Sequence, residues 1–457
     1  MSTAFPLLPI LVILGMFALL LAGLKIIEKR WNVHQEILRK AVHVCSGLFA
    51  LPLPWIFDDA LPVIIAGGLI GATLVSARLI PSMRRSIGTI MGGVQRNTLG
   101  EIYFVISVVI LFLISQGQWL LYVVPVLTMS LADTAAAVIG IRYGQMQYQT
   151  SEGIKSVEGS LAFFLVTFFS THLPLLLFTD TGRLESILIA AILALLVMML
   201  ELISWRGLDN IFVPLSTHAF LRLYLGEDAQ LLLFHLMIAI VLIAFTLAWR
   251  RRSKLDDSAL VGCSLFGYAT FTLGGWPWLI APLGFFILYV ALWPRSTDRR
   301  SHSVYTMLSI TSGALLWLFL YAIDGKDWFL IPFAMTFASQ LTLYGISRVT
   351  LQPTLGNRLI RILGAIGIGW AFVYLPTLLI AFNPDIYLRD MIVSTPDVME
   401  LLPVLGIGLL AISVASMIFL PLTKRIYGPP LRANLINPSF AFIGLLASLI
   451  VSLHWLV

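Results

Sequence analysis

The chain has 457 residues, of which 29 are Lys or Arg and 23 are Asp or Glu, giving a net charge of +6. Charged residues make up 11% of it, whereas a soluble domain carries about 25%. Hydrophobic residues make up 59%, and the mean hydropathy is +0.94. These values exclude a soluble globular protein, a disordered chain and a disulfide-stapled secreted domain. They indicate a polytopic α-helical membrane protein, whose positive charge reflects cytoplasmic loops rather than a nucleic-acid partner.

Sixteen apolar runs predict the membrane-spanning helices. They lie at residues 7–24, 42–57, 61–77, 102–115, 119–141, 158–178, 186–204, 208–225, 229–248, 258–274, 277–293, 303–322, 329–347, 362–381, 400–422 and 437–455. Because a span needs about 20 mostly apolar residues, we expect an all-α polytopic membrane protein with about 15–16 transmembrane helices. The first run lacks a basic leader and a cleavage site, so we interpret it as a retained span.

The basic residues predict the orientation of these spans. With the N-terminus outside, the inner loops hold all but four of the 29 Lys and Arg residues, the exceptions being Arg183, Arg222, Lys326 and Arg389. This distribution follows the positive-inside rule. The run 208–225 is weak because it contains Asp209, Pro214 and His218, yet omitting it would place the basic residues at 250–254 outside. It therefore either crosses the membrane or forms a re-entrant element.

The acids predict where chemistry occurs, because a carboxylate inside the bilayer costs about 2.5–3.5 kcal/mol. Asp133 lies inside a predicted span, Glu101 opens one and Glu201 ends one. After Asp209, every acid falls in a loop or at a loop boundary. The chemistry is therefore expected in the first half of the chain.

The densest polar cluster begins at Asp133. Asp133, Gly140 and Gly144 fall on one helix face, and the small residues permit close approach of a ligand or simply of another helix. The adjoining loop adds a cation, two hydroxyls, a carboxylate and a glycine: Lys155, Ser156, Glu158, Gly159 and Ser160. Lysine and serine suit a phosphate group, and the carboxylates of Asp133 and Glu158 suit Mg²⁺. No Walker motif is present, so the cluster predicts an anion or nucleotide site of another kind.

Two smaller clusters have structural alternatives. Arg39 and His43 are one helical turn apart at a span entry, and an imidazole there is a candidate proton acceptor, although Arg39 and Lys40 alone would be topology anchors. Asp209 and Asn210 would by themselves be a helix cap. Cys45 and Cys263 have no partner at metal-ligand spacing and are expected to be buried, inert thiols.

Several motifs together resemble the phytol kinase and dolichol kinase family. They are R-K-x-x-H at 39–43, G-E-I-Y at 100–103, D-T-x-A-x-x-x-G-x-x-x-G at 133–144, K-S-x-E-G-S at 155–160 and D-N-x-x-V-P-L at 209–215. The resemblance covers about residues 30–228 in the family's order. It implies a membrane-embedded kinase that phosphorylates an isoprenoid alcohol, typically with CTP. The family commonly has a polar residue or glycine before the aspartate, where this chain has Ala132.

The resemblance also implies roles for individual residues. It places Asp133, Lys155, Ser156, Glu158 and Ser160 in a nucleotide–metal site, with Arg39, His43, Glu101, Asp209 and Asn210 around it. We predict a catalytic membrane domain at 1–250 and a non-catalytic membrane domain at 251–457. Within the second domain, residues 258–275 resemble phytyl-phosphate kinase-like membrane proteins. That family would have an acidic motif in the segment 327–348, where this chain has Gln340 and Leu341 instead. That domain is then a degenerate copy, or it shapes a lipid groove or a partner surface.

The sequence thus predicts a kinase that transfers a phosphoryl group from CTP, or another nucleoside triphosphate, to a lipid alcohol such as phytol or dolichol. The alcohol would arrive from the bilayer and the nucleotide from the cytoplasm, with Mg²⁺ as cofactor and the active site at the cytoplasmic face. His43, Asp133, Lys155 and Glu158 are the predicted catalytic residues, and the first, second or fourth would accept the hydroxyl proton. A cytidylyltransferase that makes a CDP-lipid, or a lipid transporter or flippase without nucleotide turnover, are the alternatives.

Overall fold

The computed structural model describes residues 7–31, 35–80, 99–150, 153–292, 302–351, 357–381, 398–427 and 433–456. The predicted inner loops at 81–98 and 293–301 lie outside these residues. The described chain is built of helices and one short antiparallel β-hairpin. It divides into two compact units, Met1–Ile240 and Val241–Val457, which we call unit 1 and unit 2.

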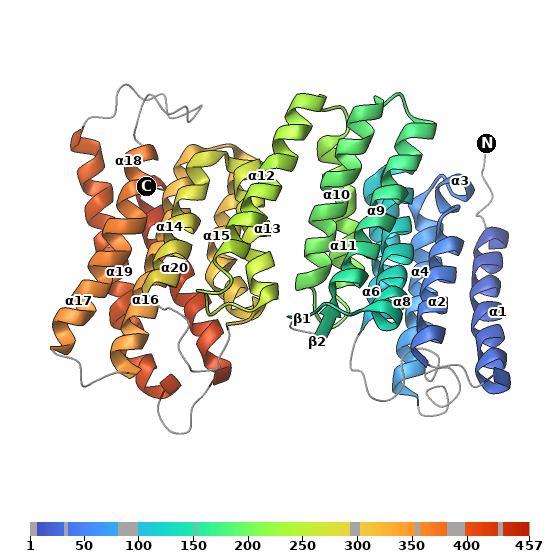
Figure 1. Cartoon of the computed structure of the whole chain (residues 1–457), viewed down its shortest axis with the longest axis horizontal. Helices are drawn as coiled ribbons and strands as arrows, with labels where there is room; N and C mark the ends of the chain where they lie inside the picture. The colour runs from blue at the N-terminus through green and yellow to red at the C-terminus, as the bar shows by residue number, and fades with distance from the viewer. Residues whose placement is uncertain are drawn as a thin grey trace. The chain divides into compact units, whose positions relative to one another are not determined.

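Unit 1 is a bundle of helices with a small hairpin at one end (Figure 1). Its helices are α1(Leu7–Trp31), α2(Gln35–Ala50), α3(Leu53–Ile56), α4(Ala60–Leu79), α6(Gly100–Ser115), α7(Trp119–Leu127), α8(Asp133–Tyr143), α9(Val157–Phe178), α10(Arg183–Ile203) and α11(Asp209–Tyr224). The following helix, α12(Ala229–Ala248), crosses the boundary between the units. The hairpin consists of β1(Gln147–Thr150) and β2(Gly153–Ser156), with Tyr148 opposite Lys155.

A π-helical turn joins α7 to α8. It covers Thr128–Ala132, so that the chain from Trp119 to Tyr143 forms one long apolar helix. Pro125 precedes the turn inside α7 and removes one backbone donor from the helix. Such π turns are rare overall, but those that occur often lie at functional sites. Asp133 is the first residue after this turn.

Unit 2 is built around one central helix, α16(Leu330–Leu351). In the most apolar 18-residue stretch of Asp327–Leu351, 94% of the residues are buried. The surrounding helices are α13(Asp257–Gly274), α14(Trp276–Leu292), α15(Val304–Asp324), α17(Arg358–Gly369), α18(Leu375–Ala381), α19(Val398–Tyr427) and α20(Ile436–Leu456). The shorter segments η2(Asp327–Phe329), η3(Trp370–Tyr374) and η4(Ala433–Leu435) adjoin α16, α18 and α20. Gln340 of α16 is fully buried and its Nε2 donates to the carbonyl of Phe440 at 2.8 Å.

The helices confirm the predicted class of an all-α polytopic membrane protein. Each of the sixteen predicted apolar runs overlaps a helix. Within the described residues, eleven helices are long and apolar enough to cross a membrane, and α6 and α14 are shorter apolar helices. The weak run 208–225 forms α11, a 16-residue helix that buries one face. On that face His218 Nδ1 lies 2.9 Å from the carbonyl of Leu121, which explains a histidine in an apolar run.

Candidate functional site

A polar pocket of about 340 Å³ lies where the hairpin meets the ends of the helices of unit 1. Its volume is within the range of small-molecule sites. The lining residues that carry polar side chains come from α8, both strands, the start of α9, the end of α10, the α10–α11 connection and the start of α11: Asp133, Gln147, Thr150, Lys155, Ser156, Ser160, Glu201, Ser204 and Asp209. One lysine thus faces three carboxylates and several hydroxyls, a set that binds phosphate and a divalent cation.

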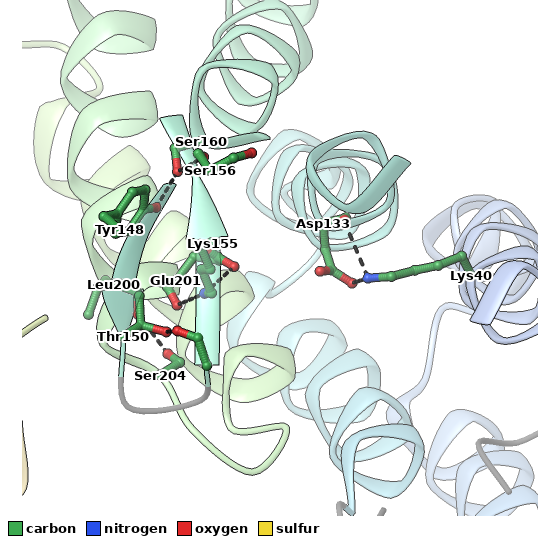
Figure 2. Close-up of polar contacts among 11 residues, drawn as sticks. Lys40, Asp133, Tyr148, Thr150, Lys155, Ser156, Ser160, Leu200, Glu201 and Ser204 are labelled. Carbon is green, nitrogen blue, oxygen red and sulfur yellow. Dashed lines mark hydrogen bonds and ion pairs between the residues drawn. The ribbon is translucent and has the colours of Figure 1, made fainter. Parts of the chain in front are cut away.

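Lys155 is held at this pocket by Glu201. Its Nζ lies 2.7 Å from Oε1 of Glu201 and 3.1 Å from the Glu201 carbonyl, as Figure 2 shows. Burial alone would lower the pKa of Lys155, but the carboxylates of Glu201 and Asp209 outweigh that effect and raise the pKa above its ordinary value. Lys155 is therefore a fixed cation throughout the neutral pH range.

The first turn of α9 is set by Ser156. Ser156 is the N-cap, and its Oγ accepts a hydrogen bond from the Gly159 N–H at 3.1 Å. The Tyr148 hydroxyl lies 2.5 Å from the Ser160 hydroxyl, which ties strand β1 to this helix (Figure 2). The pocket wall therefore combines the N-terminus of α9 with two serine hydroxyls, an arrangement that favours anions.

The glycines of the predicted cluster allow α8 and α9 to approach closely. A Cβ on Gly159 would lie 2.9 Å from the Ala136 carbonyl, and one on Gly144 would lie 2.8 Å from the Ser156 Cβ. Gly140 faces Ser156 in the same way and also lines the pocket. Close helix packing, the alternative to ligand contact, thus accounts for Gly144, whereas Gly140 and Gly159 serve both purposes.

Asp133 is paired with Lys40 of α2. The Lys40 Nζ lies 2.5 Å from Asp133 Oδ2 and 3.3 Å from the Asp133 carbonyl, and Figure 2 shows this side chain reaching across from the neighbouring helix. The side chain of Lys40 is only 7% exposed. Because a buried cation without a partner is strongly unfavourable, this pair fixes α2 against α8 at the edge of the pocket.

A second pocket, almost entirely apolar, lies beside the first in unit 1. It is a slot between α1, α2, α4 and α6. The side chains at one end are polar, and these are Arg39, His43, Glu101 and Asn210. Apart from Ser46 and two glycines, the remaining lining is aliphatic and aromatic, and it continues to Leu53 and Phe57. Such a slot suits a hydrocarbon chain that carries one polar group at its end.

His43 links the apolar slot to the polar pocket. It lines the slot, and its Nε2 lies 2.9 Å from the Met129 carbonyl of the π turn and 3.9 Å from Asp133 Oδ2. Because a carbonyl only accepts, Nε2 carries the proton and Nδ1 keeps a lone pair. The ring also packs edge-on against Phe104, with centroids 4.8 Å apart. The Met129 carbonyl, Asp133 and Phe104 therefore fix the orientation of the imidazole ring.

The other polar residues at this end of the slot have partners of their own. Glu101 accepts a hydrogen bond from Arg78 at 2.6 Å, which joins α4 to α6. Asn210 Nδ2 donates to the Gly207 carbonyl at 3.2 Å, and the Ser107 hydroxyl donates to the Asn210 carbonyl. These contacts fix the polar end of the slot in one geometry.

The structure thus divides the predicted site residues among three places. The polar pocket brings together Asp133, Gly140, Lys155, Ser156, Gly159, Ser160 and Asp209, and the polar end of the slot holds Arg39, His43, Glu101 and Asn210. Gly144 and Glu158 line neither pocket. Glu158 Oε1 instead accepts a hydrogen bond from the Met146 N–H at 3.1 Å, so it orders the turn before the hairpin.

The donors at the polar pocket suit a metal–nucleotide complex rather than a metal held by the protein alone. Among the described residues, no group of three or more His, Cys, Asp or Glu side chains is arranged to hold a metal ion. Mg²⁺ is commonly bound through one or two carboxylates together with substrate phosphates. The carboxylates of Asp133, Glu201 and Asp209 around one pocket fit that mode.

Sequence reasoning missed two residues of this site. From the sequence, Lys40 is interpreted as a topology anchor, and Glu201 is noted only as one of the acids at a span end, yet they are the ion-pair partners of Asp133 and Lys155. A signal was present for Glu201, because an acid at the end of an apolar span requires a cation nearby. In the sequence, no feature distinguishes Lys40 from a topology anchor.

The comparisons with known proteins identify relatives of the chain. It is 30% identical over 187 residues to the phytol kinase of Synechocystis sp., a match that covers 40% of this chain and 76% of the relative. It is 27% identical over 236 residues to a probable chloroplastic phytol kinase of Triticum aestivum, covering 48% and 78%. It is 29% identical over 157 residues to the CTP-dependent diacylglycerol kinase 1 of Schizosaccharomyces pombe, covering 32% and 71%.

No protein-family model and no solved structure matches the chain. The phytol kinase of Synechocystis is nevertheless 30% identical to the chain, and the match covers 76% of that relative. The resemblance carried by the motifs at 39–43, 100–103, 133–144, 155–160 and 209–215 is thereby confirmed, and the chain belongs to the phytol kinase-like family of membrane proteins.

Proposed function

We propose that this protein is a membrane-embedded lipid-alcohol kinase that takes its phosphoryl group from CTP or another nucleoside triphosphate. The observation that carries the proposal is the pair of adjoining pockets with opposite chemistry. The polar pocket around Lys155 suits a triphosphate, and the apolar slot suits the chain of a lipid alcohol. His43 and Asp133 lie 3.9 Å apart where the two meet.

In this reaction the oxygen of the lipid hydroxyl forms a bond to the terminal phosphorus of the nucleotide. The bond from that phosphorus to the bridging oxygen breaks, and the nucleoside diphosphate leaves with the electron pair. The hydroxyl proton passes to Nδ1 of His43, and the Asp133 carboxylate stabilises the resulting imidazolium. His43 is favoured over Glu158 because it lines the slot, whereas Glu158 is bound to the Met146 N–H.

The remaining residues position the charges of the nucleotide. Lys155 and the hydroxyls of Ser156 and Ser160 bind phosphate oxygens, and the fixed lysine offsets charge that develops on the transferred group. Mg²⁺, carried with the nucleotide and held by Asp133 and Asp209, would neutralise phosphate charge. Because such cations bind together with phosphates, removing Mg²⁺ with a chelator is expected to abolish transfer.

We further propose that unit 2, which begins within α12, is a non-catalytic membrane domain. The sequence predicts such a domain for residues 251–457. Gln340 stands where an acidic motif was expected, and it packs α16 against α20 through the Phe440 carbonyl. We also propose that the end of unit 1 carrying the hairpin faces the cytoplasm, because the predicted inner loops and the nucleotide supply lie on that side.

The test is a nucleotide-by-alcohol panel. The purified chain in lipid vesicles is incubated with Mg²⁺ and γ-labelled CTP or ATP, together with phytol, geranylgeraniol, dolichol or diacylglycerol. We expect label in the lipid and release of nucleoside diphosphate. Release of pyrophosphate would instead reveal a cytidylyltransferase, and lipid movement without nucleotide turnover would reveal a transporter. Absence of label with every donor, in folded protein, would overturn the proposal.

Matched variants separate the site from general effects. Asp133→Asn and Lys155→Ala remove charges from the polar pocket and are expected to lower kcat at least about 100-fold. Asp257→Asn and Lys25→Ala are their controls, because each breaks an ion pair elsewhere, with Arg250 and Glu28 respectively. Control variants that lose as much activity as the pocket variants would contradict the assignment.

A further inference from the structure

The apolar slot of unit 1 has one polar and one apolar end. Its polar end is marked by Arg39 of α2 and Glu101 of α6, and the Arg78–Glu101 pair places the last turn of α4 at the same end. At the other end the lining residues include Leu53 and Phe57, which are 6% and 3% exposed. They belong to one packed cluster with Ala50, Val63 and Tyr122, so this end is filled by side chains.

We propose that Leu53 and Phe57 close the slot and set the upper limit on the chain length of the lipid alcohol. The inference rests on the proposed function, since it assigns the slot to the acceptor. Its occupant is a single hydrocarbon chain whose hydroxyl lies at His43. The position of His43 identifies this occupant, because His43 lines the slot and lies 3.9 Å from Asp133 of the polar pocket, so a chain bound elsewhere would not present its hydroxyl to this histidine.

The helices that line the slot give its length. The pocket-lining stretch of α2 runs from Arg39 to Ala50, and that of α4 runs from Val63 to Leu74. Each covers eleven helical steps, or about 16 Å at 1.5 Å per residue. A zigzag chain of single bonds near 1.5 Å advances about 1.25 Å per carbon, so about 13 carbons extend from the polar end to the closed end.

The closed end, rather than the gain from burying each carbon, decides which chains bind. An alcohol that enters from the bilayer leaves surroundings as apolar as the slot, so each methylene gains little on binding. A chain longer than the slot must force Leu53 and Phe57 aside, and overpacking of this kind lowers binding about 5- to 150-fold. The acceptors are therefore alcohols with a main chain near this length, and long polyprenols are poor substrates.

The experiment measures kcat/KM and binding for saturated and isoprenoid alcohols whose main chains are shorter than, equal to and longer than the slot. Binding is followed directly, by the amount of each radiolabelled alcohol that the protein retains at equilibrium. We expect kcat/KM and affinity to stay constant for alcohols that fit the slot and to fall for longer ones. The chain length at which they fall, which we call the break, should be near the estimated length of the slot. Phe57→Ala should move the break by about four carbons to longer chains, since the ring occupies that length. Ala66→Leu, which fills the slot from α4, should move it to shorter chains.

Leu111→Ala is the matched control, because Leu111 is fully buried in the same cluster but does not line the slot. It is expected to lower stability and leave the break in place. A profile without a break, or a break that neither Phe57→Ala nor Ala66→Leu moves, overturns the inference even if lipid is phosphorylated. A break in binding with no phosphoryl transfer to any alcohol supports the limit that Leu53 and Phe57 set on chain length, and it overturns the proposed function instead.

Discussion

The Lys40–Asp133 ion pair is expected to contribute to stability only as a pair. At 2.5 Å and an effective dielectric constant near 20, the attraction between the two charges is about 7 kcal/mol before the desolvation of both groups is subtracted. Desolvation cancels much of it, so replacing both partners by neutral groups is close to neutral. Replacing one partner leaves an uncompensated buried charge and costs about 3–5 kcal/mol.

We therefore predict a strong coupling between Asp133→Asn and Lys40→Met. Asp133→Asn should be destabilised by about 3–5 kcal/mol because it leaves the buried Lys40 charge without its partner, whereas Lys40→Met should cost less because Asp133 is 21% exposed and lines the polar pocket. The double variant should recover to within about 1 kcal/mol of the native protein. Phosphoryl transfer should remain lost in all three, since Asp133 is gone from the polar pocket in two of them and misplaced in the third.

The two cysteines permit the measurement in each unit separately. Cys45 lies on α2 in unit 1 and Cys263 lies on α13 in unit 2, and both are free thiols. Denaturant-dependent labelling of Cys45, in a Cys263→Ser background, reports the unfolding of unit 1. The control is the Lys25–Glu28 pair of the same unit, whose lysine side chain is 40% exposed, and Lys25→Ala should cost at most about 1 kcal/mol. A double variant as unstable as Asp133→Asn alone would refute the reasoning.

Three further predictions concern other parts of the chain. Because its neighbours raise the pKa of Lys155, its contribution to stability is complete below its ordinary pKa and is lost only as pH rises through the raised value. Lys155→Met should thus lower the stability of unit 1 equally at about pH 6 and about pH 9, because both values lie below the ordinary pKa of lysine. A loss of stability confined to one of these pH values would contradict this. Burial, and the nearby charge of Lys254, lower the pKa of His302 to about 4. Unit 2 should therefore lose about 3 kcal/mol of stability as pH falls from 7 to 4, and His302→Gln should remove that slope when Cys263 labelling is followed. Gly159→Ala should cost about 1–3 kcal/mol by separating α9 from α8, whereas Gly68→Ala, with nothing within 4 Å of its Cβ, should be neutral or stabilising in the same unfolding assay.

The fold class could be predicted from the sequence because one physical requirement dominates a membrane protein. Apolar runs must form helices to satisfy their backbone hydrogen bonds, so every predicted run overlaps a helix. The deviations also have a physical reason. The predicted span at 119–141 is one helix, as expected, but Pro125 and the π turn at 128–132 interrupt it, and periodicity does not reveal a turn of one extra residue.

The composition of the site could be predicted, but its division could not. Asp133 and Lys155, which the motifs place in one site, line one pocket together with Asp209, which they place around it, because polar residues that the bilayer excludes must gather where they can pair. The sequence does not show that Arg39, Glu101 and Asn210 face a different pocket. That separation depends on how α2, α6 and α11 pack, and the spacing of residues along one helix does not determine contacts between helices.

A kinase for lipid alcohols must bring a highly charged donor to an acceptor that is soluble only in the bilayer. A single cavity would have to be both polar and apolar, and burying phosphate charge among hydrocarbon groups is costly. Unit 1 avoids this cost by placing a polar pocket and an apolar slot next to each other. His43 lines the slot and lies 3.9 Å from Asp133, which lines the polar pocket and is paired with Lys40. The π turn makes this possible, because the Met129 carbonyl within it holds the imidazole while Asp133 follows directly after it.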